Sequence, residues 1–358
     1  MREINVAGAG PSGLTAAINL AKAGYTVNVF EKRSDAGKRF HGDVQGLENW
    51  SEPTNVLQDL QRMNIAVNFD CDPFLKQITT NGSRSRISHY PPESPLCYLV
   101  KRGAQPGSLD QGLKAQALAA GVNVHFSQTI PLEEADIVAT GPISHEIFAV
   151  DKGVVFRTSY GDTNIFLVND AAAYKGYAYL LITKGYGCLC TVLFDKFERL
   201  DACFETSKQM LRDAFPFDMQ EPKPVAGIGC FSTQNVFQKG KSLYVGEAAG
   251  LQDLMWGFGI RTAVYSGYVA ANCIINHQDY ARVAEALFVP RQKATLASRF
   301  MWELVRFNNY ALVVGNTLDI IGLKSFELPS LYNFGPLQKL IYGIALPFVR
   351  RRYPKLRI

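Results

Sequence analysis

Several features that point to particular classes of protein are missing from this sequence of 358 residues. Its seven cysteines are an odd number and form no Cys-x-x-Cys pair, which disfavours a disulfide framework and a zinc or iron–sulfur site. Its five histidines lie far apart, without the spacing of metal ligands, so we expect no metal site. No uninterrupted apolar run reaches the roughly 18 residues that a membrane-spanning helix needs, and we expect no crossing of a bilayer.

Acidic residues are scarce at the C-terminal end. Residues 290–358 hold eleven Lys and Arg against three acids, a net charge of +8, so the preceding part carries −3 of the overall +5. Within 331–358, apolar residues at helical spacing come before the basic run 350–357, a pattern typical of a helix on an anionic membrane surface. We therefore expect peripheral membrane contact through 331–358 and no nucleic-acid partner. A packing helix with a solvated basic end is the alternative, and the oligomeric state stays open.

No charged and then apolar leader precedes the first predicted strand, so we expect a cytoplasmic protein, with any membrane contact at the inner face. No internal repeat or low-complexity tract is visible either. What remains is a composition of 47% hydrophobic and 19% charged residues, which is typical of a globular, enzyme-sized chain with two or three lobes.

The N-terminal residues combine a strand, a glycine-rich turn and a helix. The order along residues 4–14 is Ile-Asn-Val-Ala-Gly-Ala-Gly-Pro-Ser-Gly-Leu. Gly8 lets the strand turn sharply, Gly10 lets the backbone approach a pyrophosphate, and Gly13 lets the helix lie close to the sheet. The first turn of the helix, with Pro11 and Ser12, directs amides and a positive dipole end at the phosphates.

An acidic residue closes the next predicted strand. Glu31 follows the apolar run 26–30 and comes 21 residues after Gly10, close to the roughly 20 residues expected for a carboxylate that accepts hydrogen bonds from an adenosine ribose. We expect Glu31 and the adjacent Lys32 to face the cofactor. Because Glu31 would repel a 2′-phosphate, the dinucleotide should be FAD or NAD(H) rather than NADP(H). A glycine-rich turn without a ligand is the alternative.

A second glycine-rich segment lies far along the chain. The predicted strand 243–246 ends in Gly-Glu-Ala-Ala, which places a carboxylate where it can accept hydrogen bonds from a ribityl chain. The loop that follows leads into a predicted helix, whose bare N-terminal amides would meet a flavin pyrimidine, where negative charge accumulates on reduction. The residues of this segment that we expect to bind the cofactor are Gly246, Glu247, Gly257, Gly259 and Ile260.

With both segments in place, the chain resembles the glutathione-reductase-type FAD superfamily, in the branch of aromatic hydroxylases, lycopene cyclases and geranylgeranyl reductases. The resemblance covers roughly residues 4–276. Glu247 stands where the family usually has aspartate. Thr140 stands where an acid is usual, next to Gly141, which the resemblance places at the cofactor.

The resemblance also assigns an arginine to the cofactor site. Arg102 resembles the arginine that closes over FAD at the end of its strand, and Asp110 resembles the acid that opens the following helix. Residues 103–108 make the spacing between them longer than the family's. A surface salt-bridge residue is the alternative for Arg102.

The segment 38–47 lies where geranylgeranyl reductases have a cysteine near the flavin. No cysteine occurs in it, so a mechanism that requires that thiol does not transfer to this chain. We expect Arg39 to bind the cofactor. His41 is the best proton donor that the segment offers, because imidazole titrates near neutral pH; a hydrogen-bonding or surface role is the alternative.

Residues 175–182 resemble the geranylgeranyl reductase pattern Gly-x-Tyr-x-Trp-x-Phe-Pro. Tyr177 matches the pattern, whereas Tyr179 replaces the tryptophan. Tyr177, Tyr179 and Leu181 share one face of a strand. With Trp256, they are expected to hold an apolar substrate chain above the flavin, and Tyr177 is a second candidate proton donor. Core packing between the sheet and the cofactor lobe is the alternative.

Taken together, the patterns predict an α/β fold, with a Rossmann-like FAD-binding domain, an inserted antiparallel β-sheet substrate domain and a helical C-terminal region. The expected boundaries are 1–68, 96–152 and 232–285 for the FAD-binding domain, 69–95 and 153–231 for the substrate domain, and 286–358 for the helical basic region.

The resemblance implies an FAD-dependent oxidoreductase that transfers hydride between flavin N5 and an isoprenoid or lipid-like substrate. NAD(P)H or another compound would supply the electrons. A flavin monooxygenase of the aromatic-hydroxylase type, a redox-neutral cyclase and a non-catalytic flavoprotein recruited to a membrane are the alternatives.

Overall fold

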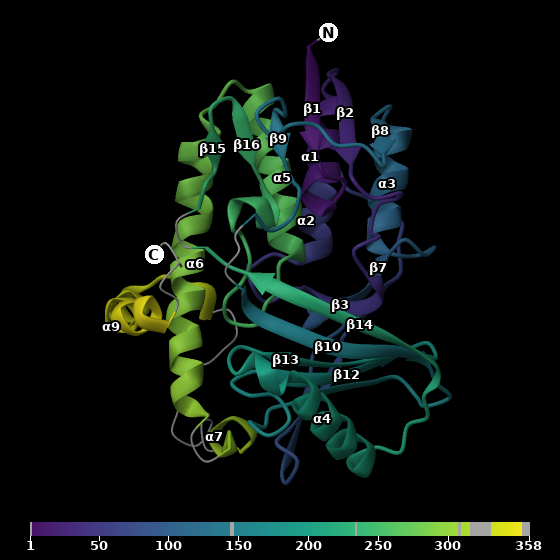
Figure 1. Cartoon of the computed structure of the whole chain (residues 1–358), viewed down its shortest axis with the longest axis vertical. Coiled ribbons are helices and arrows are strands. Elements are labelled where there is room, and N and C mark those ends of the chain that lie inside the picture. Colours follow the sequence, from purple (N-terminus) through teal and green to yellow (C-terminus); the bar gives the residue numbers. More distant parts are fainter. Residues whose placement is uncertain (1, 144–146, 233–234, 307–308, 316–330, 353–358) are drawn as a thin grey trace.

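The computed structural model describes residues 2–143, 147–232, 235–306, 309–315 and 331–352. Its strands form three sheets, and Figure 1 shows the sheet that holds the chain's N-terminal strand above the larger, strongly twisted one. The predicted α/β class is confirmed. Among the described residues, no helix is both long and apolar enough to cross a bilayer.

The N-terminal strands form the Rossmann-like sheet. Its order is β15-β16-β9-β1-β2-β8, and all neighbours except β15 and β16 run parallel. The strands are β1 (Glu3–Ala7), β2 (Thr26–Glu31), β8 (Asn123–Phe126), β9 (Ile137–Val138), β15 (Gln238–Lys239) and β16 (Ser242–Tyr244). The predicted strand at 243–246 is shorter than expected, because η2 (Gly246–Ala249) is already a 3-10 turn.

Helix α1 (Pro11–Lys22) packs on β1 and β2 of this sheet, and α3 (Leu109–Ala119) and α5 (Ile260–Ile275) pack on α1. Two glycines allow the close approach of α1 to its neighbours. A Cβ at Gly13 would lie 2.1 Å from the Gly8 carbonyl oxygen, and a Cβ at Gly267 would lie 2.0 Å from the Ser12 carbonyl oxygen. The role predicted for Gly13, tight packing of helix on strand, therefore has a direct steric basis.

A seven-stranded sheet forms the second lobe, in the order β14-β10-β13-β12-β11-β5-β6. The strands are β5 (Lys76–Thr80), β6 (Ser85–His89), β10 (Ile147–Arg157), β11 (Thr163–Leu167), β12 (Tyr177–Thr183), β13 (Tyr186–Leu193) and β14 (Gln220–Cys230). Five of the six strand pairs are antiparallel, as expected, and one departs from the expectation, because β11 pairs with β5 in parallel. The boundary expected between 152 and 153 also divides β10, which belongs to this sheet along its whole length.

The two faces of this sheet have different neighbours. Alternate side chains, among them Leu180 and Leu189, join a core with Phe204 and Leu211 of α4 (Leu200–Ala214). α4 follows η1 (Phe197–Arg199) and covers this outer face. The intervening side chains of the same strands point the other way, as the two-residue period of a strand requires. That inner face faces the rest of the molecule.

A three-stranded antiparallel sheet lies between the two lobes. It consists of β3 (His41–Glu48), β7 (Cys97–Gly103) and β4 (Cys71–Pro73). The sequence patterns gave no strand for 41–48, because Gly42 and Gly46 interrupt the apolar alternation. Both glycines sit under aromatic groups: a Cβ would lie 2.5 Å from the Tyr186 hydroxyl at Gly42 and 2.8 Å from the Phe258 ring at Gly46.

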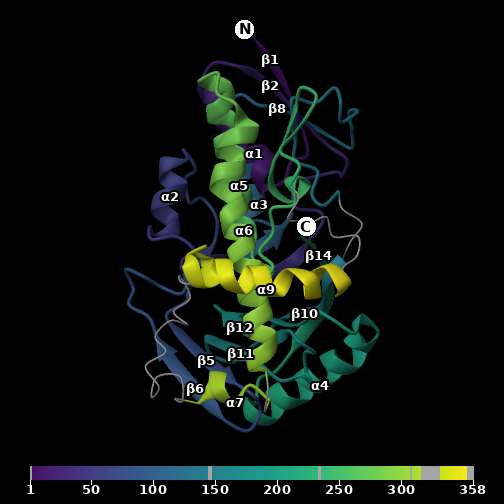
Figure 2. The same ribbon diagram turned by 90° about the vertical axis from the view of Figure 1, so that its left-hand side faces the viewer.

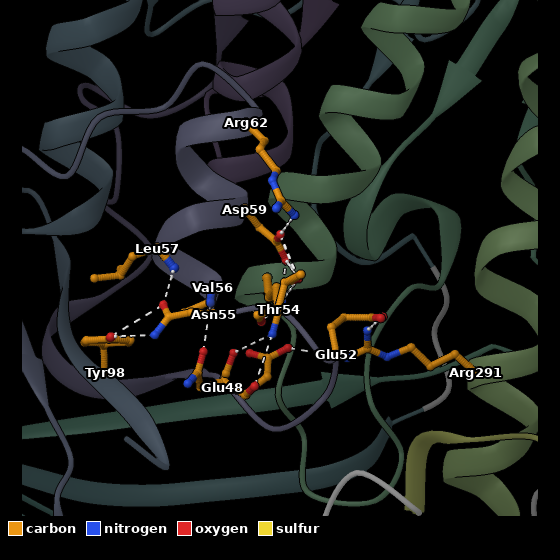
Figure 3. Close-up of polar contacts among 12 residues, drawn as sticks. Glu48, Glu52, Thr54, Asn55, Val56, Leu57, Asp59, Arg62, Tyr98 and Arg291 are labelled. Atoms are coloured by element: carbon orange, nitrogen blue, oxygen red, sulfur yellow. Dashed lines mark hydrogen bonds and ion pairs between the residues drawn. The ribbon is translucent and has the colours of Figure 1, made fainter. Parts of the chain in front are cut away.

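A polar network fastens the segment after β3 to two distant helices. Arg261 at the start of α5 donates to the Thr54 carbonyl 2.8 Å away and forms an ion pair with Asp59 of α2 (Val56–Arg62). Arg291 pairs with Glu52 at 2.8 Å and lies 3.7 Å from Glu48. Figure 3 shows both carboxylates turned toward Arg291, and Asp59 between Thr54 and Arg62.

The C-terminal region is helical, as predicted. It contains α6 (Tyr280–Val305), α7 (Ala311–Val314) and α9 (Pro336–Arg352). α6 runs along both lobes, and α9 lies across it (Figure 2). The residues 353–358 of the predicted basic tail lie outside the described part of the chain.

Candidate functional site

A cavity of about 1090 Å³ is lined by residues of all three sheets. This volume is slightly larger than the roughly 300–1,000 Å³ of most small-molecule sites. Gly10 and Glu31 line it in the Rossmann-like lobe, and Tyr177 and Trp256 line it at the second lobe. The structure therefore brings the predicted dinucleotide residues and the predicted substrate residues to one continuous space.

The glycine turn leaves room for a phosphate. Gly8 has φ +107, and a Cβ there would lie 2.4 Å from the Ala139 carbonyl oxygen. At Gly10, by contrast, a Cβ would meet no described atom closer than 4.0 Å. Gly10 is the N-cap of α1, and no described side chain caps that end. The first amides of α1 are thus available to an anion.

Glu31 is held in place by the turn that it faces. Its Oε2 accepts a hydrogen bond from the Ala9 amide at 2.9 Å, and its Oε1 accepts one from the Arg33 amide at 3.0 Å. A carboxylate has about four acceptor positions, so the geometry leaves capacity for ribose hydroxyls. Lys32 also lines the cavity. These residues fit the adenosine half of a dinucleotide.

Three segments that were predicted to contact the cofactor converge in the cavity, and they hold Arg39, Gly141 and Glu247. Arg39 Nη1 lies 2.7 Å from Glu247 Oε2, and the two side chains are 35% and 24% exposed. A Cβ at Gly141, whose φ is +83, would lie 3.6 Å from Arg39 and 3.8 Å from Glu247. The longer Glu247, in place of the family's aspartate, is thus fixed by an ion pair through one of its oxygens.

Arg102 is buried and forms an ion pair with Asp110. Its Nε and Nη2 each lie 2.9 Å from an oxygen of Asp110, and Phe40 stacks on the guanidinium with its ring centre 4.2 Å away. Burial alone would lower the pKa of Arg102, but the nearby carboxylates, Asp110 first among them, together raise that pKa. The inserted loop folds back, since the Ser108 hydroxyl donates to the Gly103 carbonyl at 2.6 Å.

The loop before α5 presents backbone rather than side chains to the cavity. Gly257 has φ +82, and a Cβ there would meet no described atom within 4 Å. Gly259 is the N-cap of α5, again without a capping side chain among the described residues, and Ile260 is the first residue of the helix. Asp253 shapes the loop by accepting hydrogen bonds from the Met255 amide at 2.8 Å and the Trp256 amide at 3.1 Å. The arrangement fits the polar edge of a flavin ring.

Aromatic side chains form the far wall of the cavity. Tyr177 lies against Phe166 and Trp256, with ring centres 5.0 and 5.8 Å away, and Trp256 contacts Trp302 at 4.6 Å. Tyr179 and Leu181 also line the space. The predicted strand face thus forms part of the cavity wall, next to tryptophans from the loop and from α6.

Two of these tryptophans have unused hydrogen-bond donors. The indole nitrogens of Trp256 and Trp302 are buried, and neither has a hydrogen-bond partner in the described part of the chain. A buried donor without a partner costs about 1–3 kcal/mol. Both residues line the cavity, but these nitrogens are themselves covered by protein and do not face its open space.

Tyr177 is a poor proton donor in this setting. Its hydroxyl donates a hydrogen bond to the Trp256 carbonyl. Burial raises the pKa of Tyr177 far above that of a free phenol. The proton is therefore held by the loop, and the side chain acts as a wall and as a support for Trp256.

His41 lies elsewhere, contrary to the expectation for a proton donor. It is the first residue of β3, where its side chain is exposed, and the described lining of the cavity does not include it. Its amide donates to Asp43 Oδ1 at 3.0 Å. Gly13 and Gly246 are not lining residues either; Gly246, with φ +58, turns the chain and donates its amide to the Ser266 hydroxyl at 2.8 Å.

Sequence reasoning missed an acid in the cavity wall. Asp151 belongs to β10 and lines the cavity, and the Cys190 thiol lies 3.7 Å from its Oδ2. Burial, followed by the charge of Asp43, raises the pKa of Asp151 to about 6. The strand was expected to start only at 154, which hid the alternation that places Asp151 on the inner face with Tyr177 and Val192. Among the described residues, no group of His, Cys, Asp and Glu could hold a metal ion.

Comparison with known proteins supports a Rossmann-like fold that binds FAD. Residues 6–50 match the family described as NAD(P)-binding Rossmann-like domain. No curated protein matches the sequence. A geranylgeranyl bacteriochlorophyll reductase-like protein from Thermoplasma acidophilum has a similar structure, with a TM-score of 0.65, 16% identity, and coverage of 99% of this chain and 100% of the other.

Two further solved structures are similar over nearly their whole length. The flavin-dependent brominase Bmp2 gives a TM-score of 0.63 at 16% identity, with 98% of this chain and 99% of the other covered. An oxygenase of 2-methyl-3-hydroxypyridine-5-carboxylic acid gives 0.57 at 16% identity, with 93% and 99% covered. These matches support the prediction of FAD. The chain has the Rossmann-like fold of the FAD-dependent oxidoreductases, as the resemblance in its sequence predicted.

Proposed function

We propose that this chain is an FAD-dependent oxidoreductase that transfers hydride between flavin N5 and an apolar, isoprenoid or lipid-like substrate. The observation that carries the proposal is the single cavity that joins the turn at Gly10 to the aromatic wall at Tyr177 and Trp256. One end offers backbone amides and a carboxylate, and the other offers mostly apolar surface. A cavity with one polar and one apolar end suits a dinucleotide whose reactive ring contacts an apolar substrate.

The residues present fit FAD along its whole length. The amides of α1 would hold the pyrophosphate, and Glu31 would hold the adenosine ribose. Glu247, fixed by Arg39, would accept hydrogen bonds from the ribityl chain, and the amides at the start of α5 would meet the pyrimidine edge. When bound, FAD supplies the hydride chemistry, while the protein supplies position, dryness and electrostatics.

We propose that Asp151, rather than His41 or Tyr177, holds the proton that substrate reduction consumes. A carboxyl with a pKa of about 6 is partly protonated near neutral pH, which is the condition for an efficient general acid. Asp151 lies on the same sheet face as Tyr177 and lines the same cavity. After donating its proton to a substrate carbon, the carboxylate would take another from solvent.

The experiment is anaerobic reoxidation of the photoreduced holoprotein by a prenyl diphosphate or a prenyl lipid, with analysis of the saturated product. Asp151→Asn should slow this step by about 10²–10⁴-fold, with the flavin spectrum retained. His41→Asn, a polar change outside the cavity, is the matched control and should react like the wild type. Equal rates for Asp151→Asn and the wild type would remove Asp151 from the mechanism.

A flavin monooxygenase of the aromatic-hydroxylase type is the second candidate. The structural similarity of this chain to an oxygenase of 2-methyl-3-hydroxypyridine-5-carboxylic acid favours this candidate. Rapid oxidation of NAD(P)H in air, coupled to a hydroxylated product, would identify it. If reduced flavin transfers no hydride to any prenyl acceptor and no substrate is hydroxylated, a redox-neutral cyclase and a non-catalytic flavoprotein are the remaining interpretations.

A further inference from the structure

One face of α9 exposes large apolar side chains to solvent. Leu337, Leu340, Ile344 and Phe348 are 54%, 63%, 51% and 62% exposed. Their spacing of three, four and four residues places them in one stripe along the helix. Exposed apolar residues that occur singly need no explanation, whereas a continuous stripe marks a surface that binds something apolar.

The opposite face of α9 is fixed to the protein. Ala345 is fully buried, and Tyr342 and Val349 pack against the cluster that contains Trp302. At the C-terminal end, Arg352 lies 2.7 Å from Glu303 of α6 and 3.2 Å from Asp195. Figure 2 shows α9 lying across α6 on the surface of the molecule. The helix therefore holds its apolar stripe outward in a defined direction.

The charged side chains of α9 itself have a single sign. The seventeen residues of α9 contain no acid. Lys339 lies beside the stripe, and Arg350 and Arg351 lie at its end; all three are exposed. This combination is the pattern of a helix that lies in the headgroup region of an anionic membrane, with its apolar side toward the acyl chains. At 1.5 Å per residue, the helix would lie flat over about 25 Å.

We propose that the exposed face of α9 docks the protein onto an anionic lipid membrane. The proposal does not depend on flavin binding or on catalysis. The proposal also places the cavity relative to the membrane, because Trp302 lines the cavity and belongs to the cluster on which α9 packs. Leu331, five residues before the helix, lines the cavity too. A docked protein would thus hold the aromatic end of its cavity on the side of the lipid.

The test is co-sedimentation of the full-length protein with vesicles of phosphatidylcholine alone or with phosphatidylglycerol added. We expect binding to the anionic vesicles that weakens as salt is raised. Arg350→Gln with Arg351→Gln should weaken binding by at least tenfold, since each cation near such a surface contributes about fivefold. Leu340→Ser with Phe348→Ser should weaken it on both lipids. Circular dichroism and flavin content would show that the variants are folded.

Matched control variants carry the same changes elsewhere on the surface. Leu118→Ser, on α3, removes an apolar side chain that is 50% exposed, and Arg212→Gln removes an exposed cation of α4. Both should bind vesicles like the wild type. Wild-type protein that stays in the supernatant, or α9 variants that bind as well as these controls, would overturn the proposal. A dimer that dissociates in the Leu340 and Phe348 variants would assign the face to a second copy of the chain and overturn it as well.

Discussion

The Asp151 carboxylate lies over the backbone of Gly227 on the neighbouring strand. A Cβ at position 227 would come within 2.5 Å of Asp151 Oδ1, a distance that no side chain tolerates without movement. β10 and β14 pair at these two residues. The absence of a side chain at position 227 is therefore what lets a half-buried carboxylate occupy this place in the cavity wall.

Gly227→Ala should displace the Asp151 side chain. We expect a loss of about 1–3 kcal/mol in the free energy of unfolding, the usual cost of overpacking, measured by urea denaturation. Combining it with Asp151→Ala should recover most of that loss, because the clash is with the carboxylate alone. Full additivity of the two changes would show that the strain at position 227 lies in the backbone instead.

Asp151→Asn should make the protein more stable at high pH. Burial raises the pKa of Asp151 from its usual 3.8 to about 6, so the folded state binds this proton more tightly than the unfolded state. Stability is therefore lost as pH rises from about 4 to about 6, up to roughly 3 kcal/mol. The variant should match the wild type near pH 4 and exceed it near pH 8, as measured by urea denaturation across that range.

Glu48 provides an internal comparison for that measurement. Burial raises its pKa to about 7 despite the nearby charge of Arg291, so Glu48→Gln should also gain stability, but over a window that extends about one unit higher. If neither variant alters the pH dependence of unfolding, both carboxylates are better solvated than their burial indicates.

The cofactor half of the site could be predicted from the sequence because its geometry is local. Gly8, Gly10 and Gly13 lie within six residues, and each is required by a turn or a close approach that the fold imposes on its immediate neighbours. Glu31 follows at a spacing set by one helix and one strand. Such short-range spacings can be interpreted without knowing how distant segments pack.

The acid that we propose as proton donor, Asp151, could not be predicted because its position depends on long-range pairing. His41 was favoured by its intrinsic pKa, but β3 directs its side chain to solvent. Asp151 is an ordinary acid in the sequence, and only the pairing of β10 with β13 and β14 buries it beside Cys190 and Gly227. The parallel pairing of β11 with β5 joins residues more than 80 positions apart and was missed for the same reason.

Asp110→Asn should destabilise the protein strongly. Asp110 forms two hydrogen bonds with Arg102 and accepts a third from the Gly103 amide at 2.9 Å. Removing its charge takes the paired carboxylate from a buried guanidinium, which costs about 3–5 kcal/mol. Lys114→Gln, which breaks the more exposed pair with Asp35, is the control and should cost at most about 1 kcal/mol. Chemical denaturation of both variants would measure how much the buried pair contributes to the free energy of unfolding.

Gly8→Ala and Gly10→Ala should separate folding from cofactor binding. At Gly8, the positive φ and the Ala139 carbonyl 2.4 Å from a new Cβ predict a loss of stability with or without FAD. At Gly10, φ is −82 and a new Cβ meets no described atom closer than 4.0 Å, so the apoprotein should be as stable as the wild type. The added methyl would instead occupy the space over the α1 amides where a pyrophosphate must approach. We expect FAD affinity to fall at least tenfold in Gly10→Ala, measured by flavin fluorescence; unchanged affinity would mean that the dinucleotide does not cross this turn.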